Sequence, residues 1–403
     1  MNILYINHYA GSVYHGMEFR PYYMAAEWVK AGHNVTMIAA DFSHIRGKNP
    51  TISKSFTEEN IDGVNYLWIK TNPYNGNGLG RIRNILSFTR QLKRRAKSLA
   101  EKYKPTVVIA SSTYPYDIHP AEKIAKFAGA KLYFEIHDIW PDTLIELAGY
   151  KRSNPAIKHM QKTTDYAFRK SHRVISILPN ADIYLKERGI DTAKFRAVPN
   201  GVMCDSEAET LPESVTNLIK ELRTQNRFIT MYAGGHAISN SLDDLVAAAR
   251  NLNNNHAIIL IGDGVEKPRL IEESKDLTNI FFVDKIRKNQ VLTALKLADA
   301  LVISAVKCSL YRYGAGMNKF YDYQLAAKPI INAVEAANDP VKDSDCGISV
   351  QSGDGVAIAA AIKEIAAKTP QERDEMGKRG YEYVHNHHDY KHLAQKFLQA
   401  LEE

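Results

Sequence analysis

The chain has few cysteines and no long hydrophobic run. Only three of its 403 residues are cysteine, Cys204, Cys308 and Cys346. Thiols in odd number and at wide spacing form neither a disulfide framework nor a zinc-ligand pattern, which favours a reducing cytoplasm. No apolar run approaches the ~18 residues that cross a bilayer. The first residues, MNILYINHYAG, lack a basic region and a cleavage site, so we expect a strand rather than a signal peptide.

Several catalytic signatures are missing as well. The sequence contains no Gly-x-Ser-x-Gly elbow, no P-loop and no His-Glu-x-x-His pair. His385, His387 and His388 cluster near the C-terminus, but no cysteine is near them, so we predict surface or helix-cap residues rather than a metal site. A chain of 403 residues with 45% hydrophobic and 24% charged residues is typical of a soluble protein with two or three domains.

Apolar strands alternate with helical segments along the whole chain. The strands are nearly continuous apolar runs, which is typical of parallel sheets covered on both faces. We therefore predict two doubly wound α/β domains, whose ligands bind at the carboxyl ends of the strands, in a cleft. The predicted strands are 3–7, 35–39, 64–69, 106–110, 132–137, 174–178 and 195–198 in the first half, and 228–233, 257–261, 280–283, 300–304, 329–333 and 347–350 in the second.

A turn signal and a polar segment indicate where the domains divide. Pro199-Asn200-Gly201 ends the first series of strands, and the segment 204–212 is acidic and polar. We predict a first domain over 1–203 and a second over 204–380. A C-terminal helix over 381–403 completes the chain, and a return of this helix to the first domain is one option.

The stretch 311–333 is the most informative in the second half. Gly314 and Gly316 precede a predicted helix from Asn318 to Ala327. Glycines allow close backbone approach, and the unpaired amides at a helix start suit an anion such as phosphate. Lys319 lies in the first turn, where the helix dipole favours an acid. Lys319 either neutralises a bound anion or is a solvated lysine, and the stretch alone favours neither interpretation.

Two further glycine turns and one histidine end predicted strands. Gly234 and Gly235 follow the first strand of the second domain, although alone they favour a plain tight turn. The sequence IGDG at 261–264 ends the next strand in the same way. His137 and Asp138 emerge from a buried strand in EIHDIWP, where a neutral histidine can donate to a substrate hydroxyl or carry a proton. The alternative is a structural histidine, but the position at a strand end favours a site.

These pieces, in this order, resemble glycosyltransferase family 4, the retaining enzymes of the GT-B fold. The matching pieces are the strand–loop–helix start with Gly11 and Gly16, then EIHDIWP, PNG, YAGG, IGDG and NKFYDYQLAAKP. The chain looks most similar to bacterial O-antigen and capsule enzymes such as the L-fucosamine transferases. The resemblance implies two Rossmann-like domains that face each other across a cleft.

The resemblance also implies roles for individual residues. The second acid of the family's paired-acid motif falls on Asp322, which should bind the ribose hydroxyls of the nucleotide. The first acid falls on Gly314, a departure in which backbone amides of 314–318 take over part of the role. The family's basic pair after YAGG is absent, and Arg312 and Lys319 are expected to neutralise the diphosphate instead. His137 falls on the histidine that contacts the transferred sugar.

The predicted site thus has three parts. The predicted catalytic residues are His137, Asp138 and Lys319; the predicted donor-binding residues are Gly234, Gly235, Arg312, Gly314, Gly316, Asn318, Lys319 and Asp322; the predicted acceptor or phosphate loop contains Gly11, Gly16 and Glu18.

The implied function is sugar transfer with retention of configuration. We expect an N-acetylated hexosamine or a deoxyhexosamine to move from a UDP-linked donor to a lipid-linked or oligosaccharide acceptor in O-antigen, lipopolysaccharide or capsule biosynthesis. No metal and no cofactor is expected, and attack on the face that the leaving group departs from is favoured over double displacement. The alternatives are a sugar-nucleotide epimerase of the same fold and a non-catalytic two-domain sugar-binding protein.

The segment from Arg81 to Lys104 is rich in cations. Its nine basic residues stand against a single acid, Glu101, and its apolar residues repeat at helical spacing. Such a helix suits an anionic membrane surface, although a sheet-covering helix with a solvated basic face has the same pattern. Because the implied acceptor is lipid-linked, we predict a peripheral protein at the inner face of the cytoplasmic membrane. No aromatic residues interleave to stack bases, so nucleic acid is not expected as a partner.

Overall fold

The computed structural model describes residues 1–17, 19–76, 78–205 and 209–403, which form two compact units. The first unit contains Met1–Asn200, Arg312–Gly316 and Tyr390–Glu403, and the second contains Gly201–Tyr311 and Met317–Asp389. The first division falls after Asn200 rather than after residue 203, and the chain rejoins the first unit at Tyr390 rather than at residue 381. No sequence pattern predicts that the short segment Arg312–Gly316 belongs to the first unit.

The first unit is built on an eight-stranded sheet. Its strand order is β3-β4-β2-β1-β5-β6-β7-β8, and all neighbours are parallel except β3 and β4. The strands are β1 (Asn2–Ile6), β2 (Asn34–Ala40), β3 (Thr57–Ile61), β4 (Val64–Ile69), β5 (Val107–Ala110), β6 (Lys131–Ile136), β7 (Arg173–Ser176) and β8 (Phe195–Ala197). The sequence did not predict β3, because this edge strand is mostly polar and exposed and therefore carries no apolar signal.

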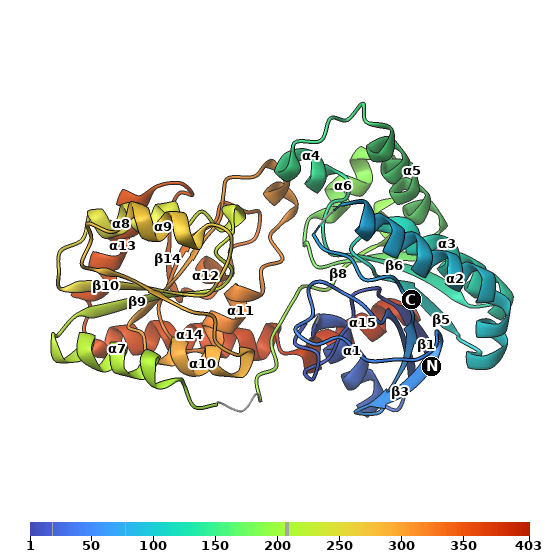
Figure 1. Ribbon diagram of the computed structural model, residues 1–403, viewed down its shortest axis with the longest axis horizontal. Helices are drawn as coiled ribbons and strands as arrows, with labels where there is room; N and C mark the ends of the chain where they lie inside the picture. Colours follow the sequence, from blue (N-terminus) through green and yellow to red (C-terminus); the bar gives the residue numbers. More distant parts are fainter. Residues whose placement is uncertain (18, 77, 206–208) are drawn as a thin grey trace. The chain divides into compact units, whose positions relative to one another are not determined.

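Helices cover both faces of this sheet (Figure 1). One face carries α2 (Leu79–Tyr103), α3 (Ile118–Ala128) and α5 (Pro155–Lys170), and the other carries α1 (Phe19–Lys30) and α15 (Tyr390–Glu402). Two short helices, α4 (Asp142–Ala148) and α6 (Ala181–Glu187), follow β6 and β7.

The C-terminal helix α15 packs on the first unit through aromatic rings. Phe397 of α15 is fully buried and contacts Trp28 of α1, with 5.0 Å between the ring centroids. The Trp28 indole Nε1 donates to the backbone oxygen of Ala394, 3.1 Å away. The last helix of the chain therefore belongs to the core of the first unit, and both chain ends lie in that unit.

The second unit has a six-stranded, fully parallel sheet in the order β11-β10-β9-β12-β13-β14. Helices α8 and α13 cover one face, and α10, α11 and α14 cover the other (Figure 1). The elements are α7 (Glu213–Thr224), β9 (Phe228–Ala233), α8 (Asp243–Arg250), β10 (His256–Ile261), α9 (Lys267–Glu273), β11 (Ile280–Val283), α10 (Lys288–Lys296), β12 (Ala300–Ser304), α11 (Asn318–Leu325), β13 (Ile330–Ala333), α12 (Pro340–Asp343), β14 (Gly347–Ser349), α13 (Gly355–Ala367) and α14 (Pro370–His387).

Both sheets have a point at which the strand order reverses. In the first sheet β1 lies between β2 and β5, and in the second β9 lies between β10 and β12. Ligands of such sheets bind beyond the carboxyl ends of the strands at these reversals. The predicted fold class, two Rossmann-like α/β units with parallel sheets, is confirmed. In the part of the chain that the structure describes, none of the helices has the length and apolarity of a membrane span.

The aromatic packing of α15 predicts a large stability effect. Phe397→Ala should lower the free energy of unfolding of the first unit by about 3–5 kcal/mol, because a buried ring is replaced by a cavity. Urea unfolding followed by tryptophan fluorescence measures the change. Lys396→Ala, on the exposed side of the same helix, is the control and should change stability little. Equal stability of the two variants would show that α15 is not part of the core.

Candidate active site

A hollow of about 500 Å³ opens at the carboxyl edge of the second sheet. Strands β9, β10 and β11 end at it, and the first turns of α10 and α11 complete its wall. The lining residues are Ala233, Gly234, Gly235, Ile261, Gly262, Asp263, Lys285, Ile286, Lys288, Val291, Met317, Asn318, Lys319 and Asp322. All of them belong to the second unit.

The glycines at the strand ends let two loops pack backbone to backbone. A Cβ on Gly262 would lie 1.9 Å from the backbone oxygen of Gly234, and a Cβ on Gly264 would lie 2.2 Å from that of His236. A Cβ on Gly234 would lie 2.4 Å from Cε of Lys319. Any side chain at these positions would push the loops apart or displace Lys319. The IGDG and YAGG turns are therefore required by the architecture of the hollow, whatever it binds.

Lys319 is a partly buried cation without a carboxylate partner. Its Nζ donates to Oδ1 of Asn240, 2.9 Å away, and lies 5.3 Å from the centre of the Tyr232 ring. No carboxylate of the described residues lies within ion-pair distance of it. Burial lowers the pKa of Lys319 to about 8, and the charge of Asp322 offsets only part of that effect. The site therefore holds an amine whose charge a bound anion would stabilise.

Two more lysines line the same hollow. Lys285 follows β11, and Lys288 opens α10 and forms an ion pair with Asp322, with 2.6 Å between Nζ and Oδ2. The sequence reasoning missed both lysines. The available signal was their place just after the apolar strand β11, in the stretch KIRK at 285–288. The hollow thus contains three lysines, one of which is neutralised by Asp322.

The structure brings together five of the predicted donor-binding residues, and three others belong to the other unit. Gly234, Gly235, Asn318, Lys319 and Asp322 line the hollow.

The other three, Arg312, Gly314 and Gly316, belong to the first unit and are not among the lining residues. Arg312 pairs with Glu187 of α6, 3.1 Å away. A Cβ on Gly316 would lie 2.4 Å from Cδ1 of Ile177, so packing alone requires this glycine. Their role in donor binding stays a prediction.

In the first unit, a buried carboxylate lies behind His137. Oε1 of Glu135 accepts from Nε of Arg20 at 2.9 Å, and Oε2 accepts from Oγ of Ser111 at 2.6 Å and from the Tyr5 hydroxyl. Burial alone would raise the pKa of Glu135, but the charge of Arg20, the neighbouring His137 and the two hydroxyl donors hold it below its usual value. Sequence reasoning assigned no role to Glu135 or Arg20.

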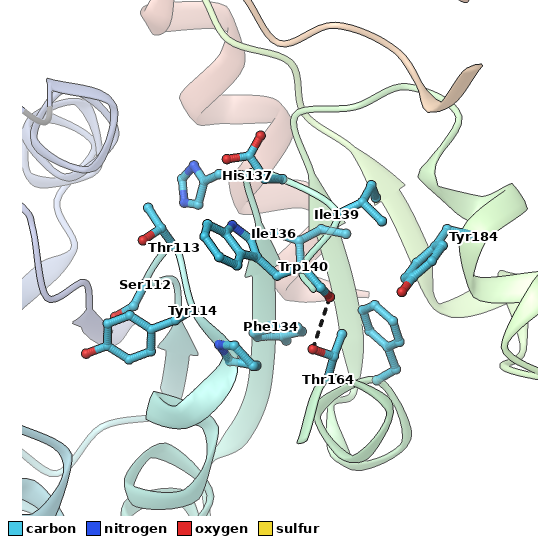
Figure 2. A pocket seen from close by; sticks show the side chains of 13 residues that line it. Ser112, Thr113, Tyr114, Phe134, Ile136, His137, Ile139, Trp140, Thr164 and Tyr184 are labelled. Carbon is cyan, nitrogen blue, oxygen red and sulfur yellow. Dashed lines mark hydrogen bonds between the residues drawn. The ribbon is translucent and has the colours of Figure 1, made fainter. Parts of the chain in front are cut away.

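His137 lies at the rim of a small cavity (Figure 2). Its Nε2 is 3.0 Å from the backbone oxygen of Ser111 and 3.8 Å from Oε2 of Glu135. The cavity, which Trp140 and Thr113 also line, has a volume of about 20 Å³, enough for about one water molecule. It cannot hold a sugar. Asp138, the next residue, is exposed. The predicted catalytic roles of His137 and Asp138 stay predictions.

The predicted acceptor loop after β1 is closely packed on itself. The backbone oxygen of Gly11 accepts from the Tyr66 hydroxyl at 2.6 Å, and a Cβ on Gly11 would lie 1.8 Å from the backbone oxygen of Met17. Gly16 has a φ of +80°, which favours glycine. Glu18 lies outside the described residues. Both glycines thus have a conformational role, and their contact with an acceptor stays a prediction.

Within the described ranges, no group of three or more His, Cys, Asp or Glu side chains could hold a metal ion. Two of the three C-terminal histidines are a surface residue and a helix-cap residue, and His385 is half-buried in the last turn of α14. His387 is exposed, and His388 is the C-cap residue of α14 and stacks on Tyr321, with 4.1 Å between the ring centroids.

Comparison with known proteins relates the first unit to a family. Residues 14–206 match the sequence model of Glycosyltransferase Family 4. These residues are therefore similar to a Glycosyltransferase Family 4 domain. This match includes Arg20, Glu135 and His137 and spans somewhat less than half of the chain. No curated protein matches the chain in sequence.

Solved structures resemble the whole chain, including the second unit beyond the family 4 match. They are HepE from Anabaena in complex with UDP and glucose (13% identity, TM-score 0.68, 100% of both chains covered), sucrose-phosphate synthase from Thermosynechococcus elongatus (16%, 0.70, 98% of this chain and 97% of that one) and WaaG, a glycosyltransferase involved in lipopolysaccharide biosynthesis (13%, 0.66, 99% of both). At these identities the likeness shows the fold, which is GT-B.

The unpaired amine in the hollow predicts a pH-dependent stability. Because the folded state favours neutral Lys319, the unfolded chain binds more protons between pH 8 and about 10.5, and stability should rise through that window. Lys319→Met should remove this rise and stabilise the protein at pH 7 by on the order of 2 kcal/mol. Chemical denaturation at several pH values measures both effects. Lys220→Met, at an exposed position of α7, is the control. If stability depends on pH in the same way in the wild type and in Lys319→Met, Lys319 is not the group responsible.

Proposed function

We propose that the chain is a retaining glycosyltransferase whose nucleotide-sugar donor binds in the hollow of the second unit. One observation carries the proposal: Lys319, a cation with no carboxylate partner among the described residues, lies in the first turn of α11 beside a glycine turn. A diphosphate supplies the negative charge that such a site lacks. The family 4 match in the first unit and the fold of the whole chain support sugar transfer as the reaction.

Each wall of the hollow offers a different part of donor recognition. Lys319 and Lys285 offer positive charge to the diphosphate, and the first amides of α11 add donors at the positive end of the helix dipole. Asp322 offers carboxylate oxygens to the ribose hydroxyls, and Lys288 holds this carboxylate in place. Arg312 is proposed as a further contact to the diphosphate. The donor nucleotide is proposed to be UDP, which is the nucleotide in the HepE complex.

The proposed reaction keeps the configuration at the anomeric carbon. The bond between this carbon and the diphosphate oxygen breaks, and its electron pair stays on the diphosphate. The acceptor hydroxyl oxygen bonds to the carbon on the same face, and its proton passes to the departing diphosphate. Lys319 and the helix amides stabilise the charge that grows on the leaving group. His137 is proposed to contact the transferred sugar, beside Asp138.

The donor sugar and the acceptor are proposed from the sequence resemblance. The sugar is an N-acetylated hexosamine or a deoxyhexosamine, and the acceptor is a lipid-linked or oligosaccharide precursor of a surface polysaccharide. WaaG, a structural neighbour, acts in lipopolysaccharide biosynthesis.

Product analysis separates this function from its alternatives. With UDP-sugar and acceptor, the enzyme should release UDP and extend the acceptor, equally with and without excess EDTA. An altered sugar still linked to the nucleotide, formed without acceptor, would indicate an epimerase. Sugar binding without turnover of any UDP-, GDP- or dTDP-sugar would indicate a binding protein.

Replacing Asp322 should weaken donor binding while the unit stays folded. Asp322→Ala removes charge-assisted hydrogen bonds of about 1.5–3 kcal/mol, a loss of roughly ten- to a hundredfold in affinity for UDP. Titration calorimetry measures the affinity, and thermal unfolding checks the fold. Asp276→Ala, which removes an exposed ion pair with Arg250 in the same unit, is the matched control. Equal UDP affinity of wild type and Asp322→Ala would exclude Asp322 from the site.

Helix α2 is proposed to hold the protein at an anionic membrane surface. Its apolar stripe, predicted to cover the sheet, divides into two parts. Leu92, Ala96 and Leu99 are buried, whereas Ile82 and Leu86 are 51% and 48% exposed. These two exposed apolar residues lie on the same helix as the basic residues. A helix that binds a membrane surface needs both exposed apolar and basic side chains.

Charge reversal on α2 should abolish binding to anionic vesicles. Arg94, Arg95 and Lys97 are exposed, and each cation near an anionic surface contributes about 1 kcal/mol, so their replacement by Glu should weaken binding more than a hundredfold. Flotation with phosphatidylserine vesicles should show the wild type bound at low salt and released at high salt.

The control variant carries the same charge change elsewhere. Lys220→Glu, Lys275→Glu and Lys296→Glu are exposed positions in the second unit. This variant should bind vesicles as the wild type does. If both triple variants lose binding equally, net charge and not α2 determines the interaction, and the proposed membrane surface is wrong.

A further inference from the structure

Glu135 is a fully buried carboxylate outside the proposed donor hollow. Its side chain has 0% exposure, and that of its partner Arg20 has 5%. A buried ion pair is costly to form, and it persists only where further hydrogen bonds satisfy both partners. Here Ser111 and Tyr5 complete the contacts of the carboxylate. Tyr5 stays a neutral donor, because burial raises the pKa of its hydroxyl well above the usual value.

Arg20 is fixed by backbone oxygens as well as by Glu135. Its Nη2 donates to the oxygen of Val198 at 2.8 Å, and its Nη1 donates to that of Pro199 at 2.7 Å. Nε is thereby directed at Glu135. The guanidinium thus links α1, the end of β6 and the segment 198–200, where the first continuous stretch of the first unit ends. The titratable groups that also act on this pair are Tyr390 of α15 and Tyr5, whose ionised forms would favour the cation, and His137 beside the carboxylate.

The hydrogen bonds around Ser111 have a fixed direction. Its backbone oxygen can only accept, so the contact with Nε2 of His137 at 3.0 Å requires a proton on Nε2. The Ser111 hydroxyl has one proton, which it donates to Glu135, because an ionised carboxylate only accepts. Toward Nε2, at 3.1 Å, the Ser111 oxygen therefore offers a lone pair. Both contacts place the proton of a neutral His137 on Nε2.

We propose that Arg20 and Glu135 are positioning residues that fix the His137 proton on Nε2 and so present Nδ1 as the hydrogen-bond acceptor for a substrate hydroxyl. The second half of this proposal rests on the proposed function, since it needs a sugar as substrate. Within the described residues, no hydrogen bond reaches Nδ1. The order of contacts is Arg20 to Glu135, Glu135 to Ser111, and Ser111 to His137, which matches the way a second carboxylate orients a histidine in many sites.

The tautomer of His137 can be measured without any substrate. In protein labelled with ¹⁵N-histidine, the ring nitrogen shifts above pH 8 distinguish Nε2–H from Nδ1–H, and His137→Gln identifies the resonance. We expect the Nε2–H form in the wild type. A dominant Nδ1–H form would overturn the proposal.

The double variant Arg20→Gln/Glu135→Gln removes both charges together, so that neither is left buried alone. The ratio of Nε2–H to Nδ1–H should fall at least tenfold, and kcat should fall about a hundredfold with little change in KM for the donor. Arg20→Lys keeps a positive charge beside Glu135 but loses the guanidinium hydrogen bonds to the backbone oxygens of Val198 and Pro199. It should retain the Nε2–H form although its melting temperature falls, which separates positioning from stability.

Two further variants guard the test. Arg188→Gln/Asp165→Asn neutralises another ion pair of the first unit, in which Nη2 of Arg188 lies 2.6 Å from Oδ2 of Asp165. This variant should alter neither the tautomer of His137 nor kcat. If the double variant at Arg20 and Glu135 fails to fold, Ser111→Ala removes the hydroxyl contact between Glu135 and His137 and keeps the buried pair. The backbone oxygen of residue 111 still accepts from Nε2, so the ratio of Nε2–H to Nδ1–H should fall, but less than tenfold. An unchanged tautomer and unchanged kcat in Ser111→Ala would overturn the proposal.

The two proposals fail in different ways. If sugar transfer is observed but the tautomer is the same in the wild type and the double variant, the positioning role is wrong and the proposed function stands. If the tautomer shifts as expected but no sugar nucleotide is turned over, the proposed function is wrong, and with it the contact of Nδ1 with a sugar hydroxyl.

Discussion

The hollow of the second unit is built around the side chain of one cation, Lys319. Lys319 is held at the start of α11 by Asn240 and the Tyr232 ring, and Gly234 leaves the space for its side chain. None of these groups carries a negative charge. Burial of a charged amine lowers the stability of the protein when no anion is bound. A bound anion offsets this cost, because it stabilises the charged form. This is the stability cost that binding sites commonly carry.

The first sheet treats charge at its carboxyl edge differently. There the carboxylate of Glu135 is already neutralised by Arg20, and its remaining contacts come from neutral hydroxyls. The result is a rigid, internally satisfied network with His137 at its end. One sheet thus offers an unmatched cation, and the other offers an oriented imidazole. A reaction in which one substrate is an anion and the other a hydroxyl compound needs both kinds of group.

Strand and helix patterns predicted the fold class because apolar runs and glycine turns are local signals. The glycine turns and the predicted helix start indicated Gly234, Gly235 and Lys319 as candidate site residues, whereas Asp322 was indicated only by the resemblance to glycosyltransferase family 4. Contacts between distant segments were beyond these local signals. Arg20 meets Glu135 only through the packing of α1 on the sheet, and a buried arginine leaves no pattern in the sequence. The assignment of Arg312–Gly316 to the first unit was missed for the same reason, and the edge strand β3 was missed because it has no apolar run.

The central claim is that the phosphate groups of a bound nucleotide stabilise the protonated form of Lys319. The most direct test is the number of protons that the protein takes up when the nucleotide binds. UDP binding should restore the charged amine, so at pH 8, close to the pKa of about 8, complex formation should take up about half a proton. Titration calorimetry in buffers of different ionisation enthalpy measures this quantity. We predict uptake in the wild type and none in Lys319→Met. UDP binding to the wild type without proton uptake would contradict the claim.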